Sequence, residues 1–396
     1  MNLKKYHFAI STAIFVATTK AITVGGGDSA SSFSLSAGAV FTAILSLVLG
    51  VLLMHRIPNR IWVYGQFRMV LLFFLLGIVS TVWSELKEVT LFRSMNGMLF
   101  LLGALGSAKI TLEKDFYNIQ PEEFIIKTLK IIILGWAFGQ LIFQYKTYGI
   151  ETIFPLRAGA AALLAAFISV WSFWIFLGIR KIKHFFDGAI YFAISISFLN
   201  FSAVLSWYVG ILAILFYRKK YAALTLLVAP IVPLFSASIY WLNQNMDVVI
   251  FGKPGAAFLI GSGRFIVYEL SLKAYTGLDF LQQLTGLGYM AEREILTGLQ
   301  VPWGADLHQS ALSALIGLGP IGLILYILFV FKPFSRIFTI RGFASRPGVI
   351  FMFLLHCMFT TYGITSSGFF YQPSLILLIY LYCLSCLTGA YKRKIW

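Results

Sequence analysis

The sequence predicts an all-α integral membrane protein of about twelve transmembrane helices, with both termini on the cytoplasmic side. Three observations indicate this fold class. The 396 residues are 59% hydrophobic and only 12% charged, with a mean hydropathy of +0.85, which excludes a soluble globular domain. Apolar runs of about 20 residues recur along the chain with short polar breaks between them. Basic residues gather in alternate breaks, as membrane topology requires.

The apolar runs give the order of the predicted spans. They lie near 7–24, 34–54, 66–83, 94–110, 124–143, 158–178, 186–200, 201–217, 221–242, 307–331, 348–366 and 370–390. The junction around Asn200 fits a kink in one helix as well as a loop between two. Because eleven further apolar runs follow the first, we expect the first helix to be retained rather than cleaved as a signal peptide.

The distribution of the 31 Lys and Arg residues orients the predicted helices. Most of them fall in breaks assigned to the cytoplasm, such as Arg180-Lys-Ile-Lys183 and Arg218-Lys-Lys220. This bias supports an even number of spans with both termini inside the cell. The net charge of +16 is therefore a sign of membrane orientation, and we expect no nucleic-acid partner.

The longest polar segment is predicted to be a single periplasmic loop before the tenth helix. It occupies residues 243–306, between nine helices in 1–242 and three helices in 307–396. Glycine-rich turns interrupt the loop, and between them Arg264–Lys273 has the pattern of a short amphipathic helix that can lie at the membrane surface. An outer loop of this length is unusual and indicates a functional role.

Arg264 stands at the start of this predicted helix, after Gly261-Ser-Gly and four residues before Tyr268. A guanidinium binds phosphate through a planar pair of donors, and the amides at a helix N-terminus favour the same anion. An arginine that braces the loop explains the string equally well. The arginine alone therefore leaves both interpretations open.

His308 begins a second pattern where the loop is predicted to re-enter the membrane. Leu312, Leu315, Gly319 and Gly322 follow it at regular spacing. An imidazole at the outer mouth of a span can accept or donate a proton near neutral pH. Taken alone, an interfacial histidine without a chemical role is the simpler interpretation, and the neighbouring Asp306 is equally ambiguous.

Together these elements resemble the shared region of the bacterial O-antigen ligase and O-antigen polymerase family. The matching order is Gly-Arg with an aromatic residue four positions on, then Gly-x-Gly, then His-x-x-x-Leu-x-x-Leu-x-x-x-Gly-x-x-Gly. It corresponds here to Arg264 and Tyr268, to Gly286 and Gly288, and to His308 with Leu312, Leu315, Gly319 and Gly322. The stretch from Thr81-Val-Trp-Ser84 to Arg93 is similar to a second, looser family feature. The close match covers roughly residues 200–325.

The resemblance implies an inverting, metal-independent glycosyltransferase of the bacterial inner membrane, with its active site facing the periplasm. The implied donor is a glycan on polyprenyl (undecaprenyl) diphosphate, and the implied acceptor is a sugar hydroxyl on another glycan or on lipid A core. No cofactor is implied, and a chain-length regulator or a flippase is an expected partner. The resemblance gives catalytic roles to His308 and Arg264. The expected substrate-binding residues are Arg157, Arg93, Lys146, Tyr268, Asp306 and Gln309.

One departure from the family pattern bears on the type of transferase. Many ligases have an arginine at the outer start of the eighth span, where this chain has Leu205-Ser206-Trp207. This difference slightly favours a polymerase of repeat units over a ligase, with Arg157 or Lys146 as the replacement cation. From another class, a lipid-linked oligosaccharide flippase or secondary transporter is the alternative. Such carriers use internal repeats and charged residues within spans, and the sequence shows no convincing repeat.

Overall fold

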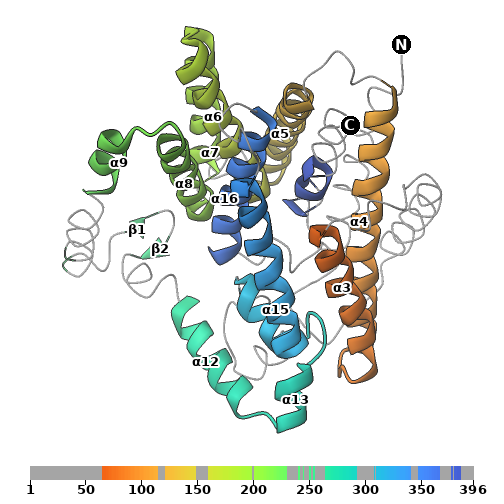
Figure 1. Ribbon diagram of the computed structural model, residues 1–396. Helices are drawn as coiled ribbons and strands as arrows, with labels where there is room; N and C mark the ends of the chain where they lie inside the picture. Colours follow the sequence, from red (N-terminus) through yellow and green to blue (C-terminus); the bar gives the residue numbers. More distant parts are fainter. Residues whose placement is uncertain are drawn as a thin grey trace.

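The structure is a computed structural model that is almost entirely helical (Figure 1). It describes residues 65–114, 121–148, 159–198, 200–229, 240, 244, 249–250, 253–254, 264–291, 307, 309–339, 347–365, 376–377 and 379–384. The strands found in these ranges are β1 (Val249–Ile250) and β2 (Lys253–Pro254), which pair antiparallel. The helical part of the predicted fold class is thus confirmed for the described chain.

The helices follow the order of the predicted spans. They are α3 (Gly65–Val79), the 3-10 helix η3 (Ser80–Val82), α4 (Lys87–Lys114), α5 (Pro121–Tyr148), α6 (Gly159–Ile179), α7 (Ile182–Ser197), α8 (Phe201–Tyr217), α9 (Tyr221–Val228), α12 (Arg264–Thr276), α13 (Phe280–Thr285), α15 (Ser310–Thr339) and α16 (Pro347–Thr365). By length and composition, the described chain has three helices that could cross a membrane, in α6, α15 and α16. These helices support a membrane protein. The count of twelve spans stays a prediction, because 7–24 and 34–54 and most of 370–390 lie outside the described residues.

Two of the predicted boundaries can be judged closely. The eighth span was expected at 201–217, and α8 has these bounds. The junction before it is a helix break: α7 ends at Ser197, and the Asn200 side chain accepts a hydrogen bond of 2.9 Å from the Ala203 N–H. An asparagine that satisfies a free N–H in the first turn is a typical N-cap. The kink considered for Asn200 is therefore wrong.

The centre of the bundle is α6, whose residues 161–170 are all buried. It packs against α5, α7, α8 and α16. Polar side chains join these helices inside the bundle: the Ser169 hydroxyl donates to the Gly188 carbonyl at 2.7 Å, and the Trp207 indole donates to Ser169 at 2.9 Å. A buried histidine on α16, His356, lies between the Val330 carbonyl of α15 and the Tyr380 hydroxyl, at 2.7 and 2.8 Å.

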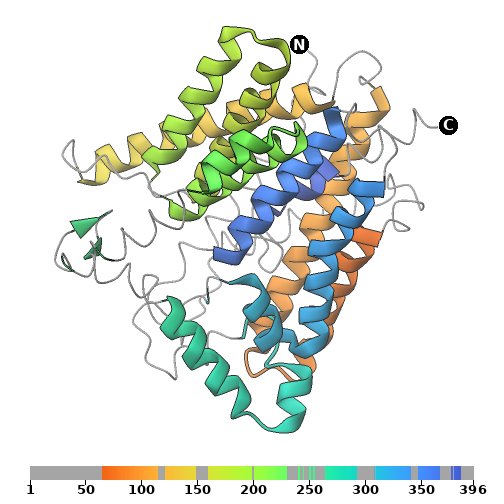
Figure 2. The same cartoon turned by 60° about the vertical axis from the view of Figure 1, so that its left-hand side comes forward.

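The helix α15 is folded back on itself at Gly319, where φ is 66° and ψ is −168°. Ser310 and Tyr326 are hydrogen-bonded through their side chains, although a straight helix would separate them by about 24 Å. A Cβ placed on Gly322 would lie 2.7 Å from the Ala314 carbonyl oxygen, which also requires two antiparallel arms. We call residues 310–318 the re-entrant arm and residues 320–339 the long arm; both are visible in Figure 2.

This hairpin corrects the predicted tenth span. The sequence led us to expect one continuous helix over 307–331 that begins at His308. Pro320 lacks an amide hydrogen and cannot continue the hydrogen-bonding ladder, and Gly319 tolerates the positive φ that the turn requires. Residues 307–331 therefore do not form one continuous helix, and Gln309 lies at the end of the re-entrant arm that is away from the bend.

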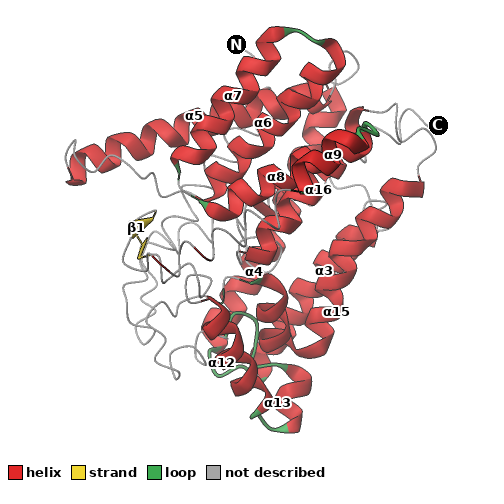
Figure 3. Ribbon diagram, turned by 90° about the vertical axis from the view of Figure 1, so that its left-hand side faces the viewer, coloured by secondary structure: helices red, strands yellow, loops and turns green. Residues whose placement is uncertain are grey.

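The candidate loop lies at one end of the bundle. Figures 1 to 3 show α12 and α13 at the end opposite the connection between α6 and α7. That connection contains the basic residues Arg180 and Lys181, and Lys183 follows in the first turn of α7. The sequence assigns these two ends to opposite sides of the membrane, and this sidedness stays a prediction. The helix expected over Arg264–Lys273 is confirmed as α12, whereas the sequence did not predict α13.

Candidate functional site

The Gly286-Leu-Gly288 turn, which follows α13, is hydrogen-bonded to the bend of α15. The Leu287 N–H donates to the Ile316 carbonyl at 2.9 Å, and the Gly288 N–H donates to the Gly317 carbonyl at 2.8 Å. In a continuous helix the Ile316 carbonyl would bond to the N–H of residue 320, which is a proline. The turn therefore supplies the donor that Pro320 lacks. Two motif segments that lie about thirty residues apart in the sequence are one structural unit.

Glycines are required on both sides of this contact. Gly286 and Gly319 have positive φ values of 74° and 66°. A Cβ on Gly286 would lie 2.5 Å from the Gly317 carbonyl oxygen, and one on Gly319 would lie 2.3 Å from the Leu284 carbonyl oxygen. Both separations are far below a normal contact, so any side chain would force the backbones apart. The conformation and the close approach together explain these two motif glycines.

The third family-like segment, which includes Ser84, contacts the same turn. A Cβ on Gly288 would lie 2.3 Å from the Ser84 hydroxyl oxygen. The next residue, Tyr289, is fully buried: its N–H donates to the Ser80 hydroxyl at 3.1 Å, and its carbonyl accepts from the Thr90 hydroxyl at 3.0 Å. Ser84 and Thr90 are themselves joined at 2.8 Å. We call Ser80, Ser84, Thr90 and Tyr289 the hydroxyl lock.

The aromatic ring of Tyr289 fixes the hydroxyl lock to the bundle. It packs edge-on against Phe73 and Phe74 of α3, with centroid distances of 5.9 and 6.1 Å. Such edge-to-face pairs are each worth about 0.5–1.5 kcal/mol beyond the area that they bury. The turn after α13 is thus held by α15 through its backbone and by α3 and α4 through side chains. Its position is set by α15 on one side and by the consecutive helices α3 and α4, much earlier in the sequence, on the other.

We expect Thr90→Val to lower the free energy of unfolding by about 1–3 kcal/mol, because the buried Tyr289 carbonyl loses this donor without a change in side-chain shape. The measurement is detergent-induced unfolding of the purified protein. Thr276→Val is the matched control, since Thr276 is exposed on α12 and donates only to the nearby Lys273 carbonyl. Equal stability of the two variants would contradict the role of the hydroxyl lock.

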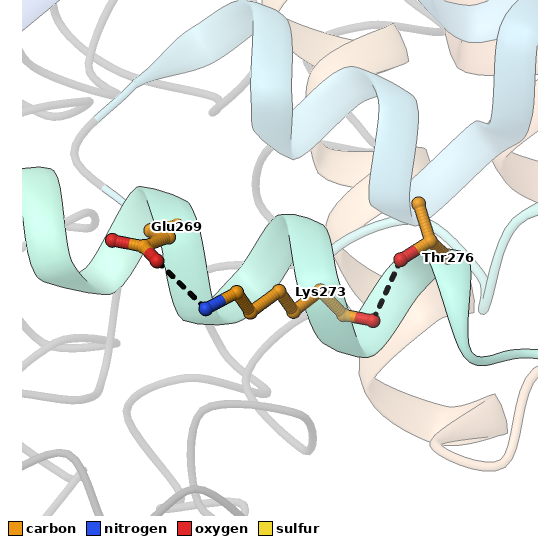
Figure 4. Close-up of polar contacts among 3 residues, drawn as sticks. All are labelled: Glu269, Lys273 and Thr276. Carbon is orange, nitrogen blue, oxygen red and sulfur yellow. Dashed lines mark hydrogen bonds and ion pairs between the residues drawn. The ribbon is translucent and has the colours of Figure 1, made fainter.

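The helix α12 lies with one face against the hairpin and the other open. Val267, Ser271 and Tyr275, spaced four residues apart, are buried. Val267 and Tyr275 belong to a cluster with Leu307 and Ile316. On the open face, Lys273 and Glu269 form an exposed ion pair at 2.7 Å, and the Thr276 hydroxyl donates to the Lys273 carbonyl (Figure 4). This ion pair lowers the pKa of the Glu269 carboxyl. The helix is therefore amphipathic, as predicted.

Three of the predicted site residues can be placed with their side chains. Arg93 is half-buried on α4, one turn after Thr90 of the hydroxyl lock, and Tyr268 is half-buried on α12. Gln309 caps the re-entrant arm, because its side-chain oxygen accepts from the Leu312 N–H and its carbonyl accepts from the Ser313 N–H. The structure thus gives Gln309, which we expected to bind substrate, a capping contact.

The remaining predicted residues are placed only in part. Arg264 is the first residue of α12, and Lys146 lies in the last turn of α5, but their side chains are outside the described residues. Arg157, Asp306 and His308 also lie outside them. The described neighbours of the two predicted catalytic residues do come together: Val267, three residues after Arg264, and Leu307, immediately before His308, belong to one buried cluster. Val267 of α12 and Leu307 thus share one buried cluster, and the placement of His308 stays a prediction.

Several residues that build this junction could not be predicted from the sequence. Ser80, Thr90 and Tyr289 were not singled out, because a lone hydroxyl or aromatic residue near a span end gives no signal for a contact 200 residues away. Pro320 could have been recognised. A Gly-Pro pair inside an apolar run is a general signal for a helix break. The run was instead interpreted by its hydrophobicity alone.

The fold and the junction define a helical protein of membrane type with a broken helix at its candidate site. Comparison of the chain with protein-family models gave no match, and comparison with curated proteins also gave none. The family resemblance therefore rests on the motif residues alone.

Proposed function

We propose that this protein transfers a glycan from a polyprenyl diphosphate donor to a sugar hydroxyl at the periplasmic face of the inner membrane. One observation carries the proposal: three of the four segments that resemble the O-antigen ligase and polymerase family meet at a single junction. The Gly286-Leu-Gly288 turn bonds to the bend of α15 and packs against Ser84. Chance similarity in three separate segments gives no reason for such hydrogen bonds between them.

The proposed reaction needs a cationic site and a base. The acceptor oxygen attacks the anomeric carbon of the donor, the bond from that carbon to the diphosphate oxygen breaks with inversion, and polyprenyl diphosphate leaves. Arg264 at the start of α12 holds the diphosphate and neutralises the charge that grows on the leaving group. His308, which precedes the re-entrant arm in the sequence, takes the proton of the acceptor hydroxyl. Arg93, Arg157 and Lys146 are the proposed additional cations.

Within this reaction class, the structure around α8 favours a polymerase. The ligase arginine is expected near Leu205-Ser206-Trp207, but here these positions serve packing. The Ser206 hydroxyl donates to the Ser202 carbonyl at 2.7 Å, and the Trp207 indole donates to Ser169 of α6. Ser206 thus bonds within α8, Trp207 joins α8 to α6, and neither side chain provides a cation for a diphosphate. A polymerase, in which lipid-linked repeat units serve both as donor and as acceptor, fits this difference from ligases.

The proposal is tested with the purified protein in proteoliposomes. An undecaprenyl-diphosphate-linked repeat unit is supplied either alone or together with lipid A core. A polymerase joins repeat units when the donor is alone, and the products form a ladder. A product that forms only with lipid A core identifies a ligase. No transfer to either acceptor, with movement of the donor across the bilayer instead, would support the flippase alternative and contradict the proposal.

Transfer is expected to survive chelation by EDTA. A metal-dependent glycosyl transfer needs clustered carboxylates to hold Mg²⁺ or Mn²⁺, and the sequence has no Asp-x-Asp or Asp-Asp pair. The measurement compares initial transfer rates before and after dialysis against EDTA, and equal rates are predicted. Loss of activity that one divalent ion restores would overturn the metal-independent mechanism.

Arg264→Lys is expected to lower transfer roughly 10- to 100-fold, because a lysine keeps the charge and loses the planar pair of donors. Donor binding should weaken in parallel, and both are measured on the same purified variant. Lys273→Arg is the matched control, since Lys273 belongs to the exposed face of the same helix. A variant Arg264→Lys with normal donor binding would remove Arg264 from the diphosphate site.

A further inference from the structure

The short helix α13 presents an apolar face that the described protein leaves uncovered. Phe280 is 80% exposed and Leu281 66% exposed, and Leu284 on the same face is also exposed. The other side of α13 is hydrogen-bonded to the preceding residues: the Gln283 side chain donates to the Thr276 and Leu278 carbonyls at 3.0 and 2.8 Å. The exposed face is therefore held in a fixed direction and does not result from a loosely attached helix.

The position of α13 beside the long arm of α15 indicates how deep its exposed face would lie in a membrane. The end of α13 touches the bend, since the Leu284 carbonyl is in close contact with Gly319. The exposed apolar residues of the long arm begin two residues later, with Ile321 and Ile324. Exposed apolar residues of the long arm therefore begin next to the end of α13, and no polar residue lies between Gly319 and Ile324.

The length of the long arm, compared with the thickness of a bilayer, also places α13 at the border of the hydrocarbon core. From Pro320 to Lys332, its first basic residue, the arm rises about 18 Å, and to its end at Thr339 about 28 Å. The hydrocarbon core of a bilayer is about 30 Å thick, and a tilt of the helix only shortens its reach. With the basic end at one membrane surface, the opposite border of the hydrocarbon lies beyond Pro320, at the level of α13.

We propose that α13 is a membrane anchor whose Phe280, Leu281 and Leu284 side chains insert into the lipid leaflet at this end of the bundle. Neighbouring residues fit a lipid border, because Val79 of α3, Val82 of η3 and Trp83, which follows η3, are exposed at the same end. Tryptophan is enriched where the hydrocarbon meets the headgroups. The anchor fixes the depth of the Gly286-Leu-Gly288 turn and, through it, the bend of α15. It is independent of the reaction proposed above.

The test measures lipid contact at individual positions of the full chain in nanodiscs of phosphatidylethanolamine and phosphatidylglycerol. With Cys357, Cys383 and Cys386 replaced by alanine, a nitroxide spin label is placed at Phe280→Cys, Leu281→Cys or Thr276→Cys. Accessibility to oxygen, which concentrates in lipid, is compared with accessibility to a water-soluble nickel chelate. We expect the oxygen-to-nickel ratio to be several-fold higher at 280 and 281 than at 276, which lies on the exposed polar face of α12.

Two results would overturn the anchor. Equal ratios at the three positions would place α13 in water, and exclusion of both reagents from 280 and 281 would show that protein covers this face instead of lipid. A second measurement uses the unsubstituted chain, so that it does not depend on the variants. A phospholipid with a photoreactive group on its acyl chain should label the peptide that contains Phe280–Thr285, and absence of labelling there, with labelling of the long arm, would contradict the proposal.

Discussion

His308→Ala is expected to lower glycan transfer by roughly 10²- to 10⁴-fold while donor binding stays nearly unchanged. This is the usual range for the loss of a positioned general base, which acts on the acceptor hydroxyl and not on the bound diphosphate. Transfer rates and binding of the lipid-linked donor are measured on the same preparation, after expression and detergent stability have been checked. A large loss of turnover with retained binding would distinguish His308 from Arg264.

The control for this prediction is His184→Ala. His184 lies near the start of α7, at the opposite end of the bundle from α12 and α13, so its loss should leave transfer unchanged. If His308→Ala retains near-normal transfer, His308 is only structural. Base catalysis would then be abandoned in favour of charge stabilisation by arginines alone.

Gly319→Ala is expected to destabilise the protein by about 3 kcal/mol and to abolish most of the transfer activity. An alanine is strained at a φ of 66°, and its Cβ would lie 2.3 Å from the Leu284 carbonyl oxygen. The clash separates the end of α13 from the bend of α15 and exposes the Ile316 carbonyl. The measurements are detergent-induced unfolding and transfer by the same variant.

The matched controls are Gly135→Ala and Gly139→Ala in α5, where a Cβ would meet no atom within 4 Å. There an alanine should stabilise the helix by about 0.5–1 kcal/mol, because it restricts the unfolded chain. If Gly319→Ala were as stable and as active as the two α5 variants, the contact between the turn and the hairpin would not be required.

Hydrophobicity predicted the helices well because each span is a local pattern. α6, α8 and α16 begin and end within a residue or two of the predicted spans, since a run of apolar residues and its polar ends are contained in one stretch of sequence. Hydrophobicity did not predict the hairpin in α15. Both of its arms are apolar, and only the Gly319-Pro320 pair distinguishes them from one long helix.

The sequence predicted which segments belong to the candidate site, but it did not predict the contacts between them. The motif spacing brought Gly286, Gly288 and Gly319 to attention, but it did not indicate that the first two would supply donors to carbonyls freed by the bend. Likewise the stretch around Ser84 was noticed, whereas its bond to Thr90 and the link from there to Tyr289 depend on packing of distant helices. Such contacts arise from tertiary structure and leave no periodic trace in the sequence.

The central claim is that Arg264 and His308 serve one donor in one site. A structure of the protein with a bound undecaprenyl-diphosphate-linked glycan, determined by electron cryomicroscopy, tests it most directly. We predict the diphosphate in hydrogen-bonding contact with Arg264, and His308 in the same cavity together with at least one of Arg93, Arg157 or Lys146. Arg264 and His308 in separate compartments, or more than about 20 Å apart without a common cavity on the scale of a ligand pocket, would contradict the claim.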